Sequence, residues 1–171
     1  MFRIIVAGTR DFNNFEMLNE ILEGYIDKMN KDSITIVSGC ARGADKFGEV
    51  FAENHSLNLV KFPANWDKYG KDAGFIRNTE MGDYASEDGY HGVLFAFWNG
   101  ISNGTKDMIT KAINHGMEIH IIVYTTNDDN EQEIAFETDT LDNDYFKTMP
   151  DEPEEEFMNE PVDDDASESD E

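Results

Sequence analysis

Three short segments of the sequence combine glycine with cationic and hydroxyl side chains, the residue types that bind phosphate. They are Gly8-Thr9-Arg10-Asp11, Ser38-Gly39-Cys40-Ala41-Arg42-Gly43-Ala44-Asp45 and Asn99-Gly100-Ile101-Ser102-Asn103-Gly104-Thr105-Lys106-Asp107. Glycine lets the backbone approach an anion closely, and a guanidinium group matches the geometry of phosphate oxygens. A phosphate-bearing ligand is therefore the first chemistry to consider. In the first segment, Gly8, Thr9 and Arg10 are the candidate binding residues, although a tight turn also explains Gly8.

The second segment leads directly into a helical pattern, so its backbone amides can face an anion at a helix N-terminus. Its spacing differs from the dinucleotide fingerprint and from the Walker A loop. The alternative is a tight turn in which Asp45 caps the helix; in the ligand-binding interpretation, which we favour, Asp45 hydrogen-bonds a ribose. The candidate binding residues of this segment are Ser38, Gly39, Ala41, Arg42, Gly43, Ala44 and Asp45.

The third segment repeats the same combination. Its candidate binding residues are Gly100, Ser102, Gly104, Thr105 and Lys106. Two such loops at one edge of a sheet indicate an extended, phosphate-bearing ligand. Trp98, just before this segment, either stacks on a base or packs beneath the loop.

A long segment from Pro63 to Asn78 has the composition of a loop over a site. Trp66 and Tyr69 are either platforms for a base or a cover for the sheet edge, and the sequence does not separate these alternatives. Arg77 and Asn78 follow at the start of a helical pattern, and we include both among the candidate binding residues.

Short apolar runs alternate with helical patterns through the first 126 residues. The runs, which suit strands buried on both faces, are Phe2–Ala7, Ile34–Val37, Leu57–Phe62, Val93–Phe97 and Ile119–Tyr124. Apolar stripes between them predict helices from Phe15 to Met29, after Asp45, over residues 73–84 and after Thr105. This alternation predicts a Rossmann-like, three-layer α/β/α domain with a parallel five-stranded sheet.

The net charge of -24 divides the chain at residue 126. Residues 127–171 hold 20 acidic residues and one basic residue, whereas residues 1–126 hold 17 acidic and 12 basic residues. We expect residues 1–126 to form the domain and residues 127–171 to be an acidic, mostly disordered tail. For residues 134–149 an added strand or a docked segment is the less favoured alternative. The balance of charge disfavours direct nucleic-acid binding.

Taken together, the segments resemble the YspA/YpsA-related branch of the SLOG superfamily, often carried by phages and bacteria. The resemblance covers residues 2–124 and rests on motifs that occur in order: Gly8-Thr9-Arg10-Asp11-Phe12, Ser38 to Asp45, Phe62-Pro63-Ala64-Asn65-Trp66, Gly74-Phe75-Ile76-Arg77-Asn78-Thr79-Glu80-Met81, Ala96-Phe97-Trp98 and Gly104-Thr105-Lys106-Asp107-Met108. It implies a Rossmannoid fold that binds a nucleotide or a nucleotide-derived ligand, such as NAD, ADP-ribose or a cyclic nucleotide. The superfamily includes the LOG phosphoribohydrolases, which cleave an N-glycosidic bond, and the DNA-binding protein DprA.

The match to the LOG enzymes is incomplete at one position. Arg77 and Met81 fit their first motif and Gly104-Thr105 fit the second, but Met108 stands where those enzymes carry Glu. Asp107 lies one residue earlier, which turns it about 100° around a helix. Two hypotheses follow. Either the protein hydrolyses a nucleotide, with catalytic Arg77 and Asp107 or Asp45, or it binds a nucleotide signal without cleaving it.

Other partners and cofactors follow from composition. The four histidines show no metal-ligand spacing with Cys40, no cofactor is indicated, and a catalytic Cys40 is disfavoured. The acidic tail is either a solubilising segment or a nucleic-acid mimic that binds a basic protein. A homo-oligomer is one option that the sequence leaves open, and we expect no membrane span. The single cysteine fits the cytoplasm, which is the host's if the chain is phage-encoded.

Overall fold

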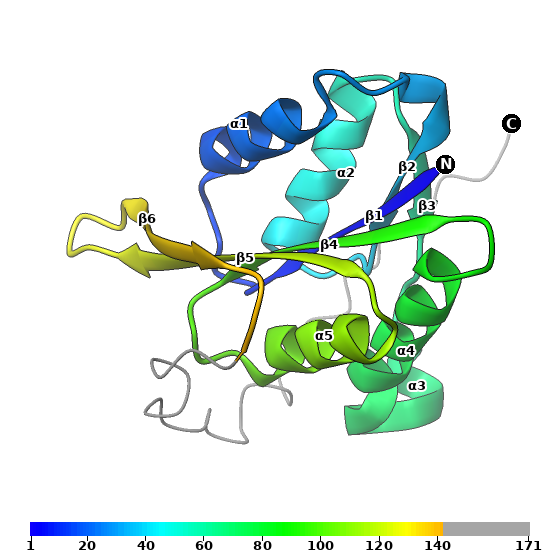
Figure 1. Cartoon of the computed structure of the whole chain (residues 1–171). Helices are drawn as coiled ribbons and strands as arrows, with labels where there is room; N and C mark the ends of the chain where they lie inside the picture. Colours follow the sequence, from blue (N-terminus) through cyan, green and yellow to red (C-terminus); the bar gives the residue numbers. More distant parts are fainter. Residues whose placement is uncertain (142–171) are drawn as a thin grey trace, which may run out of the picture.

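Six strands form one sheet in the computed structural model, which describes residues 1–141 (Figure 1). In chain order they are β1 (Phe2–Gly8), β2 (Ile34–Ser38), β3 (Asn58–Lys61), β4 (His91–Trp98), β5 (Glu118–Thr126) and β6 (Gln132–Thr138). Their order across the sheet is β3-β2-β1-β4-β5-β6. The first five strands are parallel, and this order is that of a Rossmann-type sheet. The predicted parallel sheet is therefore confirmed.

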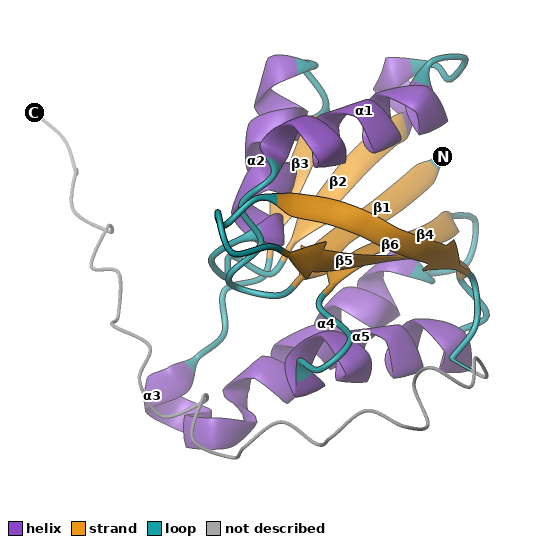
Figure 2. Ribbon diagram, turned by 90° about the vertical axis from the view of Figure 1, so that its left-hand side faces the viewer, coloured by secondary structure: helices purple, strands orange, loops and turns teal. Residues whose placement is uncertain are grey.

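Helices cover both faces of the sheet and make three layers, as predicted (Figure 2). They are α1 (Phe15–Ile26), α2 (Ala44–Asn54), α3 (Trp66–Tyr69), α4 (Ala73–Ala85) and α5 (Asn103–Asn114), with two short 3-10 turns at Lys31–Ser33 and Gly70–Asp72. Leu18 and Phe51 of α1 and α2 belong to one buried cluster, and Met81 and Ile109 of α4 and α5 belong to the other. No helix within residues 1–141 is long and apolar enough to cross a membrane.

The sheet has one strand more than predicted. Strand β6 pairs antiparallel with β5, although we expected residues from 127 onward in the disordered tail. Long-range contacts hold it: the buried Gln132 side chain accepts a hydrogen bond from the Asn13 amide (2.8 Å) and donates one to the Asp11 carbonyl (3.0 Å), while Phe136 packs on the apolar cluster beneath α5. This strand was not predicted because its exposed acidic residues interrupt the apolar pattern of a strand.

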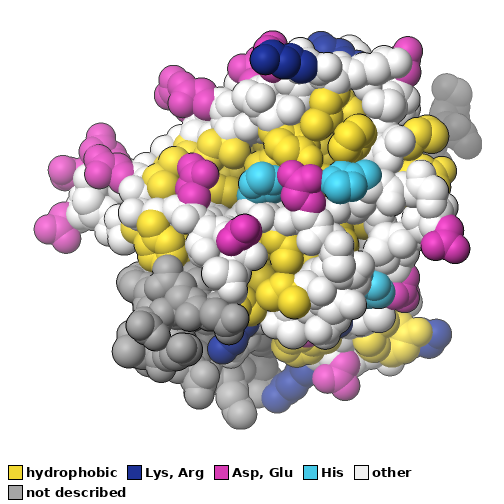
Figure 3. Space-filling view, in the orientation of Figure 1, with side chains coloured by type: hydrophobic (Ala, Val, Ile, Leu, Met, Phe, Trp, Pro, Cys, Tyr) yellow, Lys and Arg dark blue, Asp and Glu magenta, His cyan; other side chains and the backbone are white. Residues whose placement is uncertain are grey.

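Acidic side chains gather on the hairpin that joins β5 and β6, which projects from the sheet (Figure 3). Asp128, Asp129, Glu131 and Glu133 are all exposed there. Charges on an edge strand hinder pairing with a further strand. The acidic segment 142–171 lies outside the described residues, so what we predicted for that part of the tail stays a prediction.

Candidate functional site

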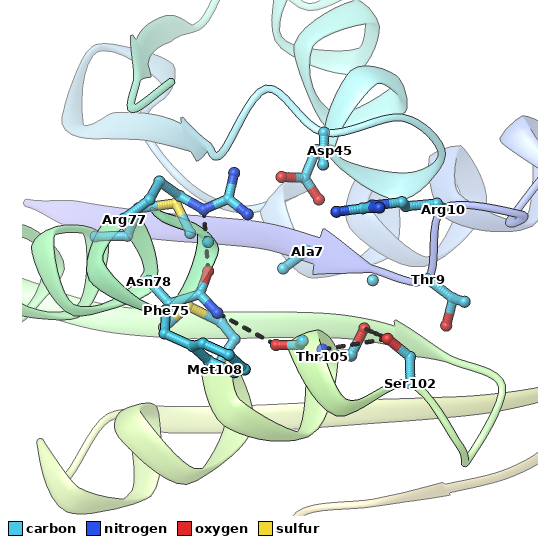
Figure 4. Close-up of a pocket in the computed structure, with 15 residues that line it drawn as sticks. Ala7, Thr9, Arg10, Asp45, Phe75, Arg77, Asn78, Ser102, Thr105 and Met108 are labelled. Carbon is cyan, nitrogen blue, oxygen red and sulfur yellow. Dashed lines mark hydrogen bonds between the residues drawn. The ribbon is translucent and has the colours of Figure 1, made fainter. Parts of the chain in front are cut away.

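A pocket opens at the carboxyl edge of the parallel strands, between β1, the loop before α2, and the first turns of α4 and α5 (Figure 4). It holds about 700 Å³ of space not filled by protein atoms, counting solvent at its mouth. The predicted binding residues that line it are Gly8, Thr9, Arg10, Ala41, Asp45, Arg77, Asn78, Ser102, Gly104 and Thr105.

Two of the predicted glycines allow the loops to meet behind this pocket. A Cβ atom on Gly8 would lie 2.2 Å from the Phe97 carbonyl oxygen, and one on Gly43 would lie 2.4 Å from the Thr9 carbonyl oxygen. Gly43 also has a φ of 77°, which side chains rarely adopt. These glycines therefore serve close packing of backbone on backbone, because the contacts they permit are within the protein.

Asp45 is the carboxylate among the described residues that line the pocket. Its side chain is only 3% exposed, and its Oδ2 atom accepts a hydrogen bond from the Gly39 amide (3.0 Å). Burial raises the pKa of Asp45 to about 6, although the Arg77 guanidinium and the backbone amides of Ala41 and Gly39 act in the opposite direction. Asp45 is therefore mostly ionised at neutral pH, inside the protein and next to a guanidinium group.

Arg77 reaches across the pocket from α4 to the loop after β2. Its Nη1 atom donates to the Gly39 carbonyl, and its Nε atom donates to Oδ1 of Asn78 (3.1 Å). The buried Asn78 amide also donates to the Gly104 carbonyl (3.2 Å). Arg77 and Asn78 thus join the second glycine-rich loop to the third and fix the guanidinium group beside Asp45.

Asp107, a predicted catalytic residue, does not line the pocket. Its Oδ2 atom accepts hydrogen bonds from Lys111 Nζ (2.6 Å) and Asn78 Nδ2 (2.9 Å). Met108, one residue later on α5, lines the pocket and is 1% exposed. The rotation of about 100° between neighbouring helical residues explains the exchange. The position expected to carry a catalytic Glu therefore presents an apolar side chain.

Hydroxyl groups and Arg10 form the opposite side of the pocket. Thr9 Oγ1 accepts a hydrogen bond from the Asn99 amide (3.1 Å), which ties the loops after β1 and β4 together. Ser102 caps α5 and accepts from the Thr105 hydroxyl (3.2 Å). Figure 4 shows the Arg10 guanidinium directed toward Asp45, so the carboxylate faces guanidinium groups on two sides.

The predicted aromatic platforms lie elsewhere. Trp98 is 1% exposed and donates from Nε1 to the Ser102 carbonyl (3.0 Å), so it packs beneath the loop and does not stack on a base. Trp66 and Tyr69 lie on α3 and do not line the pocket. The Lys68 ammonium lies 4.7 Å from the centre of the exposed Tyr69 ring.

Several further predicted residues shape the loops without lining the pocket. Arg42 and Lys106 are exposed and outside it. Ser38 is buried and donates to Glu49 Oε1 (2.8 Å). The others in this group are Gly39, Gly43 and Ala44 in the second loop and Gly100 in the third.

Sequence reasoning missed an apolar wall of the pocket, made by Ala7, Gly74, Phe75, Met81 and Met108. Three of these residues lie on α4, which approaches the pocket from the side. The prediction considered mainly residues that directly follow a strand, so it did not include them. The signal available was the motif from Gly74 to Met81, in which Phe75 and Met81 flank Arg77.

Cys40 and metal-ligating side chains are further candidates for chemistry at the pocket. Burial, reinforced by the charge of Glu49, raises the pKa of the Cys40 thiol, which disfavours its thiolate form. Within residues 1–141, no group of three or more His, Cys, Asp or Glu side chains is arranged to hold a metal ion.

The fold and the pocket define a Rossmann-like α/β protein whose site lies at the carboxyl ends of its parallel strands. Residues 2–69 match the YspA, cpYpsA-related SLOG family, so the chain carries a domain of that family over these residues. The match to this family implies a nucleotide-derived ligand in general terms. The chain is also 26% identical over 126 residues to the Gene 61 protein of Mycobacterium phage D29, a match that spans 70% of this chain and 94% of the phage protein.

Proposed function

We propose that the protein binds a phosphorylated, nucleoside-type ligand in the pocket between β1, α2, α4 and α5. The observation that carries this proposal is the convergence of Arg10, Asp45 and Arg77 in one cavity, with hydroxyl groups on one side and an apolar wall on the other. A nucleotide has the matching parts: a charged phosphate, a sugar with hydroxyl groups and a largely apolar base.

Each part of such a ligand has a complementary group in the pocket. Arg10 offers a cation and Ser102 a hydroxyl group for a phosphate. Asp45 accepts hydrogen bonds from sugar hydroxyl groups, since an ionised carboxylate is an acceptor only. Phe75 and Met108 supply apolar surface for the planar base. The large apolar share of the lining is typical of small-molecule sites.

A thermal-shift screen followed by calorimetry tests this function. The panel holds nucleoside monophosphates, cyclic nucleotides, ADP-ribose and NAD. We expect at least one to stabilise the protein, and Arg10→Ala to weaken its binding by about tenfold or more, as loss of a charge-assisted hydrogen bond does. Lys106→Ala is the matched control, because Lys106 is exposed and outside the pocket. The proposal fails if no compound stabilises the protein, or if both variants weaken binding equally.

Hydrolysis of an N-glycosidic bond is a second candidate, favoured by the single observation that Asp45 brings a carboxylate into the pocket beside Arg77. A carboxylate stabilises the oxocarbenium-like state of such a reaction. If this candidate is right, purified protein releases free base from a nucleotide, Asp45→Asn abolishes release, and Asp107→Asn retains it. Chromatography of the reaction products measures this. An inactive parent protein, or an active Asp45→Asn variant, contradicts the candidate.

A further inference from the structure

The loop between β2 and α2 has the donors of an anion site, but a side chain of the protein already occupies them. The amides of Gly39 and Ala41 hydrogen-bond the Asp45 carboxylate, and the Arg77 guanidinium lies beside it. Two amides and one guanidinium group are a donor set typical of a bound phosphate. Asp45 is the second residue of α2, so this carboxylate folds back onto the loop that precedes its own helix.

The packing around Gly39 leaves no space for a further anion at these donors. A Cβ atom placed on Gly39 would lie 2.5 Å from Arg77 Nη1 and 2.7 Å from Asp45 Oδ2. A single added carbon therefore collides with both partners. Because Asp45 is 3% exposed, its carboxylate cannot leave these donors without opening the loop.

The charges around Asp45 point the same way. Arg77 faces it from α4, Arg10 is directed toward it from the loop after β1, and Glu49 adds a negative charge from α2. A phosphate at the loop would meet the carboxylates of Asp45 and Glu49, and like charges brought together in an interface are strongly unfavourable. Arg10 and Ser102 line the pocket from outside this loop, so one phosphate can bind there.

We propose that Asp45 determines specificity by filling the second anion position, so that the pocket accepts a ligand with one phosphate group and rejects a diphosphate. This inference rests on the proposed function and names its ligand class, a nucleoside monophosphate. It also revises the expectation that two glycine-rich loops hold an extended ligand with several phosphates. One of the two loops is closed by the protein itself.

Calorimetry with adenosine monophosphate, adenosine diphosphate and ADP-ribose tests the proposal on the full chain. We expect the parent protein to bind the monophosphate at least about tenfold more tightly than the other two, because of like-charge repulsion. In Asp45→Ser the carboxylate is gone and the loop donors are free, so this preference should fall by about tenfold or more. Asp67→Ser is the control, because Asp67 is exposed and does not line the pocket, and it should keep the parent's preference.

Two further measurements keep the test decisive. If Asp45→Ser does not fold, Asp45→Ala also removes the charge and empties the anion position, and the loss of preference should persist. Phosphorus NMR with inorganic pyrophosphate as the probe should show binding to the Asp45 variant that exceeds binding to the parent. Equal affinities for mono- and diphosphate in the parent, or no gain of pyrophosphate binding in the variant, overturn the inference. A parent that binds no nucleotide while the variant gains pyrophosphate binding overturns only the proposed function.

Discussion

Replacing Asp45 with Asn is expected to raise the free energy of unfolding, relative to the parent protein, by about 2.5 kcal/mol more at pH 8 than at pH 4. Burial raises the pKa of Asp45 from 3.8 in the unfolded chain to about 6 in the folded protein. Between these values the folded state holds a proton that the unfolded state has lost. Stability therefore falls as pH rises through this window, and an amide that does not titrate avoids the loss.

Urea unfolding of both proteins at intervals from pH 4 to pH 8 measures this effect. Subtracting the two free energies of unfolding cancels the titration of the other acidic groups, so the difference reports Asp45 alone. The difference should grow between pH 4 and pH 6 and level off above pH 7, where Asp45 is fully ionised in both states. A difference that is flat, or that shrinks with rising pH, would show that Asp45 is not buried beside Arg77 as described.

The ionised Asp45 carboxylate lowers the stability of the folded protein at neutral pH, which is expected of a residue kept for binding. Glu49 is also partly buried on α2, but Lys61 Nζ lies 2.9 Å from it, and despite burial its pKa is lowered by hydrogen bonds from Lys61 and Ser38. Asp45 has Arg77 and two amides and still keeps a raised pKa. Groups with perturbed pKa values are concentrated at functional sites, since a binding site often needs a charge that folding does not favour.

The parallel part of the fold was predictable because its strands are covered on both faces. Such strands are continuous apolar runs, and the run from Val93 to Phe97 lies inside β4, where every one of these residues is buried. Strand β6 could not be predicted in the same way. Only Ile134 and Phe136 alternate among its acidic residues, and its position depends on Gln132 contacting the loop after β1, more than 100 residues earlier.

Predicting the site had a similar limit. The loops at the strand ends could be located from glycine and polar residues, because topology brings the carboxyl ends of parallel strands together. The sequence did not reveal which side chains face a ligand and which face the protein. Trp98 shows why: at the end of a strand buried on both faces, the same residue type serves the core or a ligand, and only packing beneath Ser102 decides.

Replacing Gly8 with Ala is expected to destabilise the protein by about 3 kcal/mol, an effect at the upper end of overpacking. Gly8 pairs with Phe97 where β1 and β4 end, and the next residue, Thr9, donates its amide to the Phe97 carbonyl (2.9 Å). The added Cβ would lie 2.2 Å from that carbonyl oxygen and 2.8 Å from the Ala44 Cβ atom. Both neighbours are fixed, one by the sheet and one by α2, so relief requires the strands to separate at the edge that carries the pocket.

Gly24→Ala is the matched control for Gly8→Ala, because it adds the same methyl group at a position with nothing within 4 Å. Gly24 lies inside α1, where alanine is favoured over glycine by about 1 kcal/mol, so this variant should be more stable than the parent. Urea unfolding of the parent and the two variants measures both changes in the free energy of unfolding, which should have opposite signs. If Gly8→Ala were as stable as the parent, β1 and β4 would not meet as closely as this sheet requires, and the pocket at their ends would have a different shape.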